Sequence, residues 1–280
     1  MMAASMRLSG GKPMLEITPG DRGLAARRRL ESSTLAVLFA AGGLVAGAPC
    51  ARASTSDIPA VVEKAARTFS KETAGIVGFQ RHFQTEIHGG PINHSEVSDS
   101  DFLMTDGAFT KIKYTRIVED AKVYGSSQLA GRDADANGKW KQGRVFFKEP
   151  YDARYLADYS YAESGNCDGC PADAVSIRFT SRLNDDQHGD GTMMIDRSSG
   201  HVASLTYTPK VLPQHATSAT ITETGGQALP GMWYVTHIDQ RFRGRAFLVS
   251  GRATFTANFD HFRRFDSSKA ASAALSDGSI

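Results

Sequence analysis

The chain has 280 residues, of which 41% are hydrophobic and 22% are charged, and its formal net charge at pH 7 is +2. The first 53 residues hold most of the positive excess, because the following 227 residues carry 25 basic and 27 acidic side chains. No cluster of Lys and Arg remains there to neutralise a row of phosphates, so the composition argues against nucleic acid as a partner. A segment of this length suits a single all-β or α+β domain.

The first predicted element is a secretory signal peptide. An arginine cluster at 27–29 precedes an uncharged stretch at 32–51, and Ala51-Arg52-Ala53 follows. A basic region, an apolar region and a small-residue cleavage site in this order are typical of secretory signals. We therefore expect residues 1–53 to contain an overlong start and a signal peptide cleaved near Ala53. The protein is then expected to be periplasmic, or otherwise exported, and soluble.

Two alternatives stay open for this segment, a retained membrane anchor and a lipid-modified Cys50. A membrane-spanning helix needs about 20 apolar residues, whereas the hydrophobic centre covers only 35–48 and contains three glycines. Pro49, directly before Cys50, departs from the small-residue pattern expected for lipid attachment. Signal cleavage is therefore the favoured interpretation.

A helix is predicted over residues 57–73. Apolar residues recur there at steps of three and four, after Asp57 as the N-cap and Pro59 near the first turn, which is the pattern of an amphipathic helix. The apolar positions are Ile58, Val61, Val62, Ala65, Ala66 and Phe69.

After this helix the hydrophobic period changes to two, which predicts strands. Segments 76–87, 108–118, 175–183 and 247–259 alternate apolar with polar residues, so each strand should bury one face. Between them lie turn-forming pairs, including Asn137-Gly138, and glycine-containing runs such as 189–191 and 225–226. Spacings of this kind predict an antiparallel meander of about ten strands in one sheet.

Other segments have weaker patterns. The region between Ile117 and Gly131 is predicted as a short helix or a crossing loop, and Tyr151, Tyr155 and Tyr159 permit a helical turn. The Ser/Ala-rich end at 267–280 is predicted to be disordered. The resulting domain organisation is a single domain over 54–266 between the leader and this tail.

Cys167 and Cys170 are the two cysteines that remain after residue 53. In an oxidising compartment an even pair is most simply a disulfide. A thiol-exchange centre and half of a metal site are the alternatives, but Pro171 and a strand pattern follow the pair, where an exchange centre would need a helix.

The run Asp185–Gly191 contains three carboxylates and a histidine, so Asp186, His188 and Asp190 form a weak candidate metal site. The run also lies where a hairpin loop is expected, and Asp and Gly favour turns for local reasons. The solvated loop is the favoured interpretation, and no cofactor is predicted.

Three runs give the sequence a resemblance to a known group of proteins. These are Pro150–Tyr155, Asp186–Gly191 and Leu229–Trp233, within an exported chain that has an N-terminal amphipathic helix and a long antiparallel meander. This organisation resembles the periplasmic outer-membrane lipoprotein carriers and sorting-like proteins, the LolA/LolB-like half-barrels, with RseB-like sensor domains as relatives. The resemblance implies an α+β, mainly β fold, in which a strongly curved antiparallel half-barrel has its concave face closed by the N-terminal helix and one or two short helices.

The resemblance also implies a function without catalysis. We expect an exported soluble carrier or chaperone that holds a lipid, an acylated protein or another amphiphile in an apolar cleft. An RseB-like sensor that binds a protein partner in the cell envelope is the alternative, and a metal-dependent hydrolase is a weaker one. The residues expected to line the cleft are Val61, Val62, Phe69, Val77, Phe79, Phe83, Ile112, Tyr114, Phe247, Val249 and Phe255.

Overall fold

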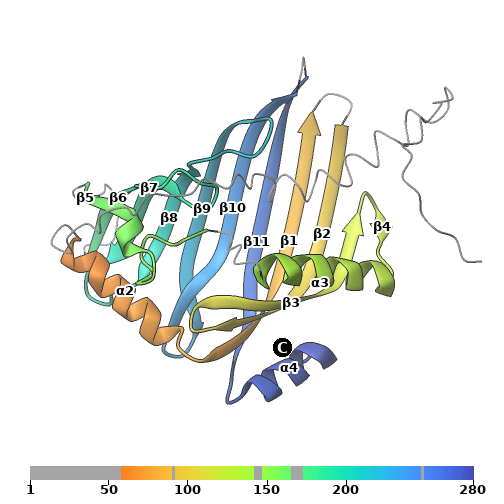
Figure 1. Ribbon diagram of the computed structural model, residues 1–280, viewed down its shortest axis with the longest axis horizontal. Helices are drawn as coiled ribbons and strands as arrows, with labels where there is room; N and C mark the ends of the chain where they lie inside the picture. The colour runs from red at the N-terminus through yellow and green to blue at the C-terminus, as the bar shows by residue number, and fades with distance from the viewer. Residues whose placement is uncertain (1–57, 90–91, 142–146, 165–172, 247–248) are drawn as a thin grey trace, which may run out of the picture. The chain divides into compact units, whose positions relative to one another are not determined.

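The computed structural model describes residues 58–280, apart from 90–91, 142–146, 165–172 and 247–248 (Figure 1). The predicted signal segment, Phe247 and the Cys167–Cys170 pair lie outside the described residues, so these predictions stay open. None of the described helices is long and apolar enough to cross a membrane.

The described residues form one antiparallel sheet of eleven strands, together with three α-helices and a short 3-10 helix, η2 (Leu156–Asp158). The strands are β1 (Ile76–Gly89), β2 (Ile92–Thr105), β3 (Ala108–Glu119), β4 (Lys122–Val123), β5 (Tyr159–Glu163), β6 (Ala174–Ser181), β7 (Gly189–Asp196), β8 (Val202–Pro209), β9 (Ala216–Leu229), β10 (Met232–Ala246) and β11 (Val249–Phe265). The helices are α2 (Ala60–Glu72), α3 (Ser126–Lys141) and α4 (Ser268–Asp277).

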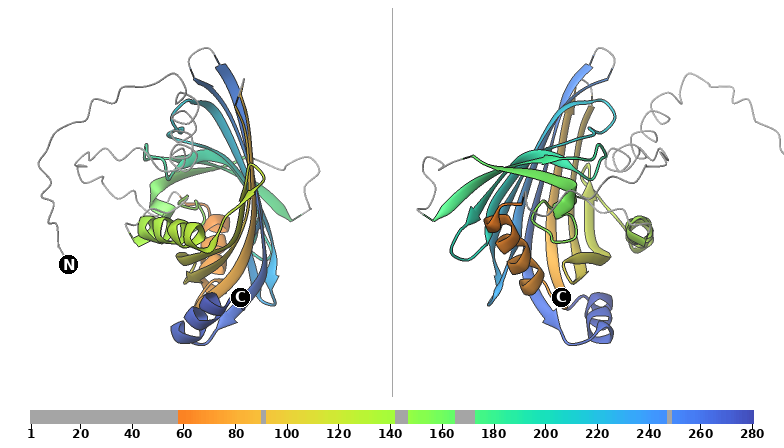
Figure 2. Two further views of the ribbon diagram at one scale, coloured as in Figure 1. Left: turned by 90° about the vertical axis from the view of Figure 1, so that its right-hand side faces the viewer. Right: turned by 60° about the vertical axis from the view of Figure 1, so that its left-hand side comes forward.

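The strand order is β4-β3-β2-β1-β11-β10-β9-β8-β7-β6-β5. Neighbours in the sheet are neighbours in sequence except for β1 and β11, which pair antiparallel in the middle. The sheet is bent and open, and α2 and α3 lie on its concave side (Figure 2). The predicted α+β, mainly β half-barrel is therefore confirmed.

Alternation along the strands places one continuous apolar face on the concave side. In β6 the side chains of Val175, Ile177 and Phe179 are fully buried, and Ile177 is paired with Met193 of β7, which is paired with Leu205 of β8. Each such side chain stabilises the fold by roughly 1.5–3 kcal/mol through the apolar area that it removes from water. The predicted alternation at 76–87 and 175–183 is confirmed.

Near the end of β3, the alternation predicts the wrong residue to be buried. Ile117 is buried there, at 1% exposure, whereas strict alternation with Ile112 and Tyr114 over 108–118 would bury Val118. The register of β2 and β3 shifts between the pairs Asp99–Arg116 and Ser100–Tyr114, so Thr115 is an extra residue. A bulge of this kind reverses the alternation beyond it.

Helix α2 begins later than predicted. Pro59, with φ of −57°, stands at the N-cap position and makes no side-chain cap, whereas the predicted cap, Asp57, lies outside the described residues. Val62, Ala65 and Ala66 are the buried residues of the helix. Val62 and Ala65 pack on the concave face against the inward side chains of β6–β9.

Helix α3 replaces a predicted turn. Asn137-Gly138, predicted as a chain reversal, lies inside this helix. The helix covers the free edge of β3, where the Ile112 N–H donates to Asn137 Oδ1 at 2.9 Å and the Tyr114 N–H donates to Asp133 Oδ1 at 2.6 Å. Unpaired strand edges need such partners, because each carries a row of unused backbone donors and acceptors.

The prediction of a disordered tail is wrong. Residues 268–277 form α4, Ser267 Oγ accepts from the Ala270 N–H at 3.2 Å as the N-cap, and Gly278 ends the helix in the left-handed conformation. Leu275 of α4 is 1% exposed and packs in a cluster with Leu103 of β2. Because Leu103 alternates with Phe102 and Met104, α4 covers the face opposite to the concave one.

Two glycine runs predicted as turns lie inside strands. Gly191 belongs to β7 and Gly225 to β9, and a Cβ atom at either position would collide with a carbonyl oxygen of β8, that of Thr206 or of Val202. These glycines allow close backbone approach rather than chain reversal.

Candidate functional site

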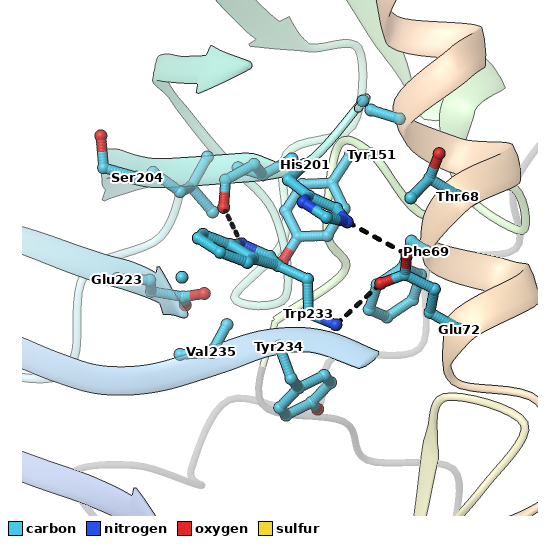
Figure 3. A pocket seen from close by; sticks show the side chains of 15 residues that line it. Thr68, Phe69, Glu72, Tyr151, His201, Ser204, Glu223, Trp233, Tyr234 and Val235 are labelled. Carbon is cyan, nitrogen blue, oxygen red and sulfur yellow. Dashed lines mark hydrogen bonds and ion pairs between the residues drawn. The ribbon is translucent and has the colours of Figure 1, made fainter. Parts of the chain in front are cut away.

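A pocket lies on the concave side between α2 and strands β8, β9 and β10 (Figure 3). Its cavity volume is about 20 Å³, which is room for about one water molecule, so side chains fill most of it. The residues that line it are Ala65, Thr68, Phe69, Glu72, Tyr151, Gly200, His201, Val202, Ser204, Leu205, Glu223, Gly225, Trp233, Tyr234 and Val235.

Aromatic rings form much of the pocket wall. Phe69 of α2 stacks with Tyr234 of β10 at a centroid distance of 6.2 Å and meets Tyr151 edge to face at 5.3 Å. The rings of His201 and Trp233 stack at 4.8 Å with an interplanar angle of 5°. Such walls provide a large apolar contact area with few rotatable bonds.

Glu72, in the last turn of α2, links the helix to the pocket wall. Its Oε1 is 3.0 Å from His201 Nε2, and its Oε2 accepts from the Trp233 N–H at 2.7 Å. A carboxylate is unfavourable at a helix C-terminus because of the helix dipole. We therefore attribute its fixed position to these two partners, which we call the Glu72 latch.

Helix α2 also makes polar contacts with the turn at 197–199. Lys64 Nζ donates to the carbonyls of Arg197 at 2.8 Å and Ser198 at 2.6 Å, and Thr68 Oγ1 donates to the carbonyl of Ser199 at 3.1 Å. The fully buried apolar residues of the helix are one valine and two alanines, and the larger Val61 and Phe69 pack against the core as partly buried residues. Polar contacts and apolar packing therefore both hold α2 against the sheet.

Glu223 lines the pocket, and Glu149 lies beside it. Glu223 of β9 is 5% exposed, and Tyr207 Oη donates to its Oε1 at 3.5 Å. Burial raises the pKa of Glu223 to about 7. Burial also raises the pKa of Glu149 well above its usual range, and the negative charge of Glu223 raises it further. The two groups are thus held largely protonated in mildly acidic solution.

Of the residues predicted to line a cleft, Phe69 lines this pocket. Four others are packed in the core at 0–2% exposure, namely Val62, Val77, Phe79 and Ile112. Phe83, Tyr114 and Phe255 lie along the same concave face. Val61 and Tyr114 are partly buried against the core clusters, Phe83 and Phe255 stack on each other at 6.2 Å, and the side chain of Val249 lies outside the described part of the structure.

Sequence reasoning missed most of the pocket. Trp233 and Tyr151 lie in runs that carry the family resemblance, which was a usable signal. No signal in the sequence pointed to the Glu72 latch, because its partner His201 is 129 positions away in the chain.

The candidate metal residues at 186–190 do not come together. His188 is fully buried, with Nδ1 2.6 Å from Asp185 Oδ1 and Nε2 3.2 Å from Asp158 Oδ2. Asp190 accepts from Lys210 Nζ at 2.6 Å, and Asp186 is exposed. Residues 189 and 190 belong to β7 rather than to a loop. The structure therefore uses His188 as a bridge between two carboxylates.

No protein-family model matches the sequence, and a search of curated proteins finds no match either. Among solved structures, a domain assigned as an outer-membrane lipoprotein-sorting protein from Vibrio parahaemolyticus is similar, with 10% identity over 78% of this chain and 97% of that one, at a TM-score of 0.41. A LolA superfamily protein from Nitrosomonas europaea has 7% identity over 75% and 96% of the two chains, at a TM-score of 0.33.

The structure of the MucA/MucB complex from Pseudomonas aeruginosa is also similar, with 10% identity over 74% of this chain and 100% of that one, at a TM-score of 0.24. The structural neighbours are thus of the LolA-like, lipoprotein-sorting and MucB/RseB kinds that the sequence resembles. All three TM-scores are below 0.5, so these similarities do not assign a function to this chain.

Proposed function

We propose that the protein is an exported carrier or chaperone that binds an amphiphile, such as a lipid or a lipidated protein, with its apolar chain beneath α2. The observation that supports this most directly is the aromatic-lined pocket between α2 and the concave face (Figure 3). Concave, mostly apolar pockets with a few polar groups are the usual sites for such ligands.

The energetics of α2 support a role as a lid. An acyl chain gains about 0.8 kcal/mol for each methylene that it removes from water. The apolar contacts that α2 would give up on moving come from Val62, Ala65 and Ala66 and from the partly buried Val61 and Phe69. An acyl chain in their place would restore apolar contact with the concave face, and the Glu72 latch gives the closed position a defined geometry.

A set of hydrogen-bond donors on the same face supports a guest with a polar head. Arg81 Nε, Ser98 Oγ and Ser100 Oγ are buried without a hydrogen-bond partner, and Arg81 is paired with Ser100 across β1 and β2. The Arg81 guanidinium carbon lies 4.9 Å from the ring centroids of both Phe83 and Phe102. Buried donors without acceptors are costly, so an anionic or carbonyl-bearing head would be stabilised beside them.

Binding of a fluorescent fatty-acyl probe to the purified protein tests the proposal. We expect saturable binding that unlabelled palmitate competes away. Val202→Phe enlarges a side chain that lines the pocket from β8 and should weaken binding at least tenfold. Val123→Phe, the same substitution at a position that is 67% exposed, is the matched control and should bind as the wild type does. Absence of saturable binding in the wild type would rule out the carrier.

Arg81→Met tests the polar head in the same assay. A hydrogen bond to a charged group contributes about 1.5–3 kcal/mol, so palmitate should bind about 10–100-fold more weakly to this variant. A neutral monoacylglycerol should be affected much less. Equal losses for both ligands would show that Arg81 acts on the fold and not on the head group.

The alternative function is a sensor that binds a protein of the cell envelope. The edge strand β5 favours it, because among the described residues β5 is paired only with β6 and leaves its other side open for an added strand. A stoichiometric protein partner that co-purifies without extractable lipid would support this second candidate over the first.

A further inference from the structure

Three side chains that commonly bind metals meet at the β3 edge of the sheet. His94 and Glu96 are two positions apart on β2, so they face the same side, and Glu96 is paired with Glu119 at the end of β3. One ligand atom from each of the three lies within 4.8 Å of the others. Glu119 is too far along the chain from His94 and Glu96 for a sequence motif to reveal this group.

The group is buried and has an unused nitrogen at its centre. The side chains of His94, Glu96 and Glu119 are only 8%, 13% and 15% exposed. His94 Nε2 has no hydrogen-bond partner, although Glu119 Oε1 lies 3.7 Å away. Two carboxylates beside a lone-pair nitrogen in a buried position form an environment that attracts a cation.

Each of the three side chains also contacts a neighbouring polar group, through an atom that the cation would not bind. His94 Nδ1 lies 3.2 Å from Asp120 Oδ2, Tyr124 Oη donates to Glu119 Oε2, and Arg132 Nη2 donates to Glu96 Oε2 at 3.1 Å. Metal-binding histidines almost always donate their second nitrogen to a carboxylate, a carbonyl or water, which fixes the ring and its tautomer. Asp120 is placed for this role.

We propose that His94 Nε2 and one oxygen each from Glu96 and Glu119 bind a zinc ion, with water as the fourth ligand. Tetrahedral zinc with bonds of about 2.0–2.2 Å sets its ligand atoms roughly 3.3 Å apart, so small side-chain rotations suffice to close the group. The imidazole favours zinc over magnesium or calcium, which prefer oxygen ligands only. Arg132 balances part of the negative charge, so a divalent ion leaves the group with little net charge.

The ion would connect three segments at the edge of the sheet. His94 and Glu96 come from β2, and Glu119 comes from β3. Of the residues that hold them, Tyr124 lies just before α3 and Arg132 lies within it. Helix α3 covers the free edge of β3 (Figure 1). Zinc would therefore hold α3 at the edge of the sheet, independently of the pocket under α2.

Zinc titration of purified, tag-free protein tests the site after a chelator has stripped it. We expect one equivalent to bind by calorimetry and mass spectrometry, and the thermal midpoint to rise by several degrees because zinc binds the folded state. Stripped protein that binds no stoichiometric zinc would overturn the proposal. So would magnesium or calcium binding at the same residues in preference to zinc.

Variants separate the site from adventitious binding. His94→Ala should abolish binding, and Asp120→Asn, which leaves every ligand in place, should weaken it about 10–100-fold. Since Asp120 is half-exposed, this second variant remains informative if His94→Ala fails to fold. His82→Ala is the matched control, because it removes an exposed histidine that also contacts a carboxylate, that of Asp99 at 2.6 Å. Equal zinc affinity in Asp120→Asn and the wild type, or a loss in His82→Ala, would contradict the assignment.

Discussion

At the scale of single residues, burial decides how the acidic groups of the pocket behave. An ordinary glutamate has a pKa near 4.5, whereas burial raises the pKa of Glu223 to about 7 in the folded protein. The unfolded chain therefore loses this proton first as the pH rises. Between the two values the folded state binds more protons, so the stability must fall as the pH increases.

This gives a prediction for the pH dependence of stability. The free energy of unfolding should decrease from about pH 4.5 to about pH 7, by on the order of 3 kcal/mol for a shift of this size. Glu149 adds to the same trend because its pKa is also raised. Chemical denaturation at several pH values measures the slope.

The control is Glu223→Gln, which keeps the shape of the side chain and removes its titration. Its slope between pH 5 and pH 7 should be clearly smaller than that of the wild type. An unchanged slope would mean that Glu223 is ionised throughout this range, in conflict with its burial beside Tyr207 and Glu149.

At the scale of elements, α4 shows how a tail of low complexity acquires structure. Alanine has the highest helix propensity, Ser267 caps the first turn and Gly278 ends the last one, so every local signal for a helix is present. The Ser/Ala-rich composition nevertheless led to a prediction of disorder. Docking of Leu275 against Leu103 supplies the apolar burial that an isolated ten-residue helix lacks.

Leu275→Ala should therefore release α4. Truncation of a buried leucine costs about 2–5 kcal/mol, and this lost stabilisation should appear as local detachment of the helix or as lower global stability. Faster amide hydrogen exchange over 268–277 measures the first, and a lower denaturation midpoint measures the second. Ser272→Ala, on the exposed side of the same helix, should change neither. Wild-type behaviour of Leu275→Ala in both measurements would show that α4 is not held by this contact.

At the scale of the whole molecule, the two faces of the sheet are covered by different helices. α2 closes the concave face over the pocket, whereas α4 packs on the opposite face. A guest beneath α2 should consequently change the concave side alone.

Hydrogen exchange with and without palmitate tests this separation. Amides of α2 and of the neighbouring turn at 197–201 should change their exchange rates when the guest binds, because their contacts with each other are rearranged. Amides of α4 should keep theirs. Equal changes in α2 and α4 would indicate a global effect on stability rather than a guest in the pocket.

Local patterns in the sequence were sufficient for the strands and for the fold class. Alternation in segments such as 76–87 and 175–183 depends only on which side chains avoid water, and a run of such segments joined by short turns leaves few arrangements other than an antiparallel sheet. The helix at α2 was predicted for the same reason. The period of its apolar residues needs no partner to be recognised.

Tertiary structure decided the rest, because the deciding contacts join distant positions. Thr115 forms a bulge only when β2 and β3 are paired, and α3 is held by the open edge of β3 in spite of Asn137-Gly138. The Glu72 latch, the grouping of His94 with Glu119, and the burial of Glu223 arise once the sheet has curved and the helices have docked. Sequence separation carries no information on such distances, so these sites became visible only in the folded chain.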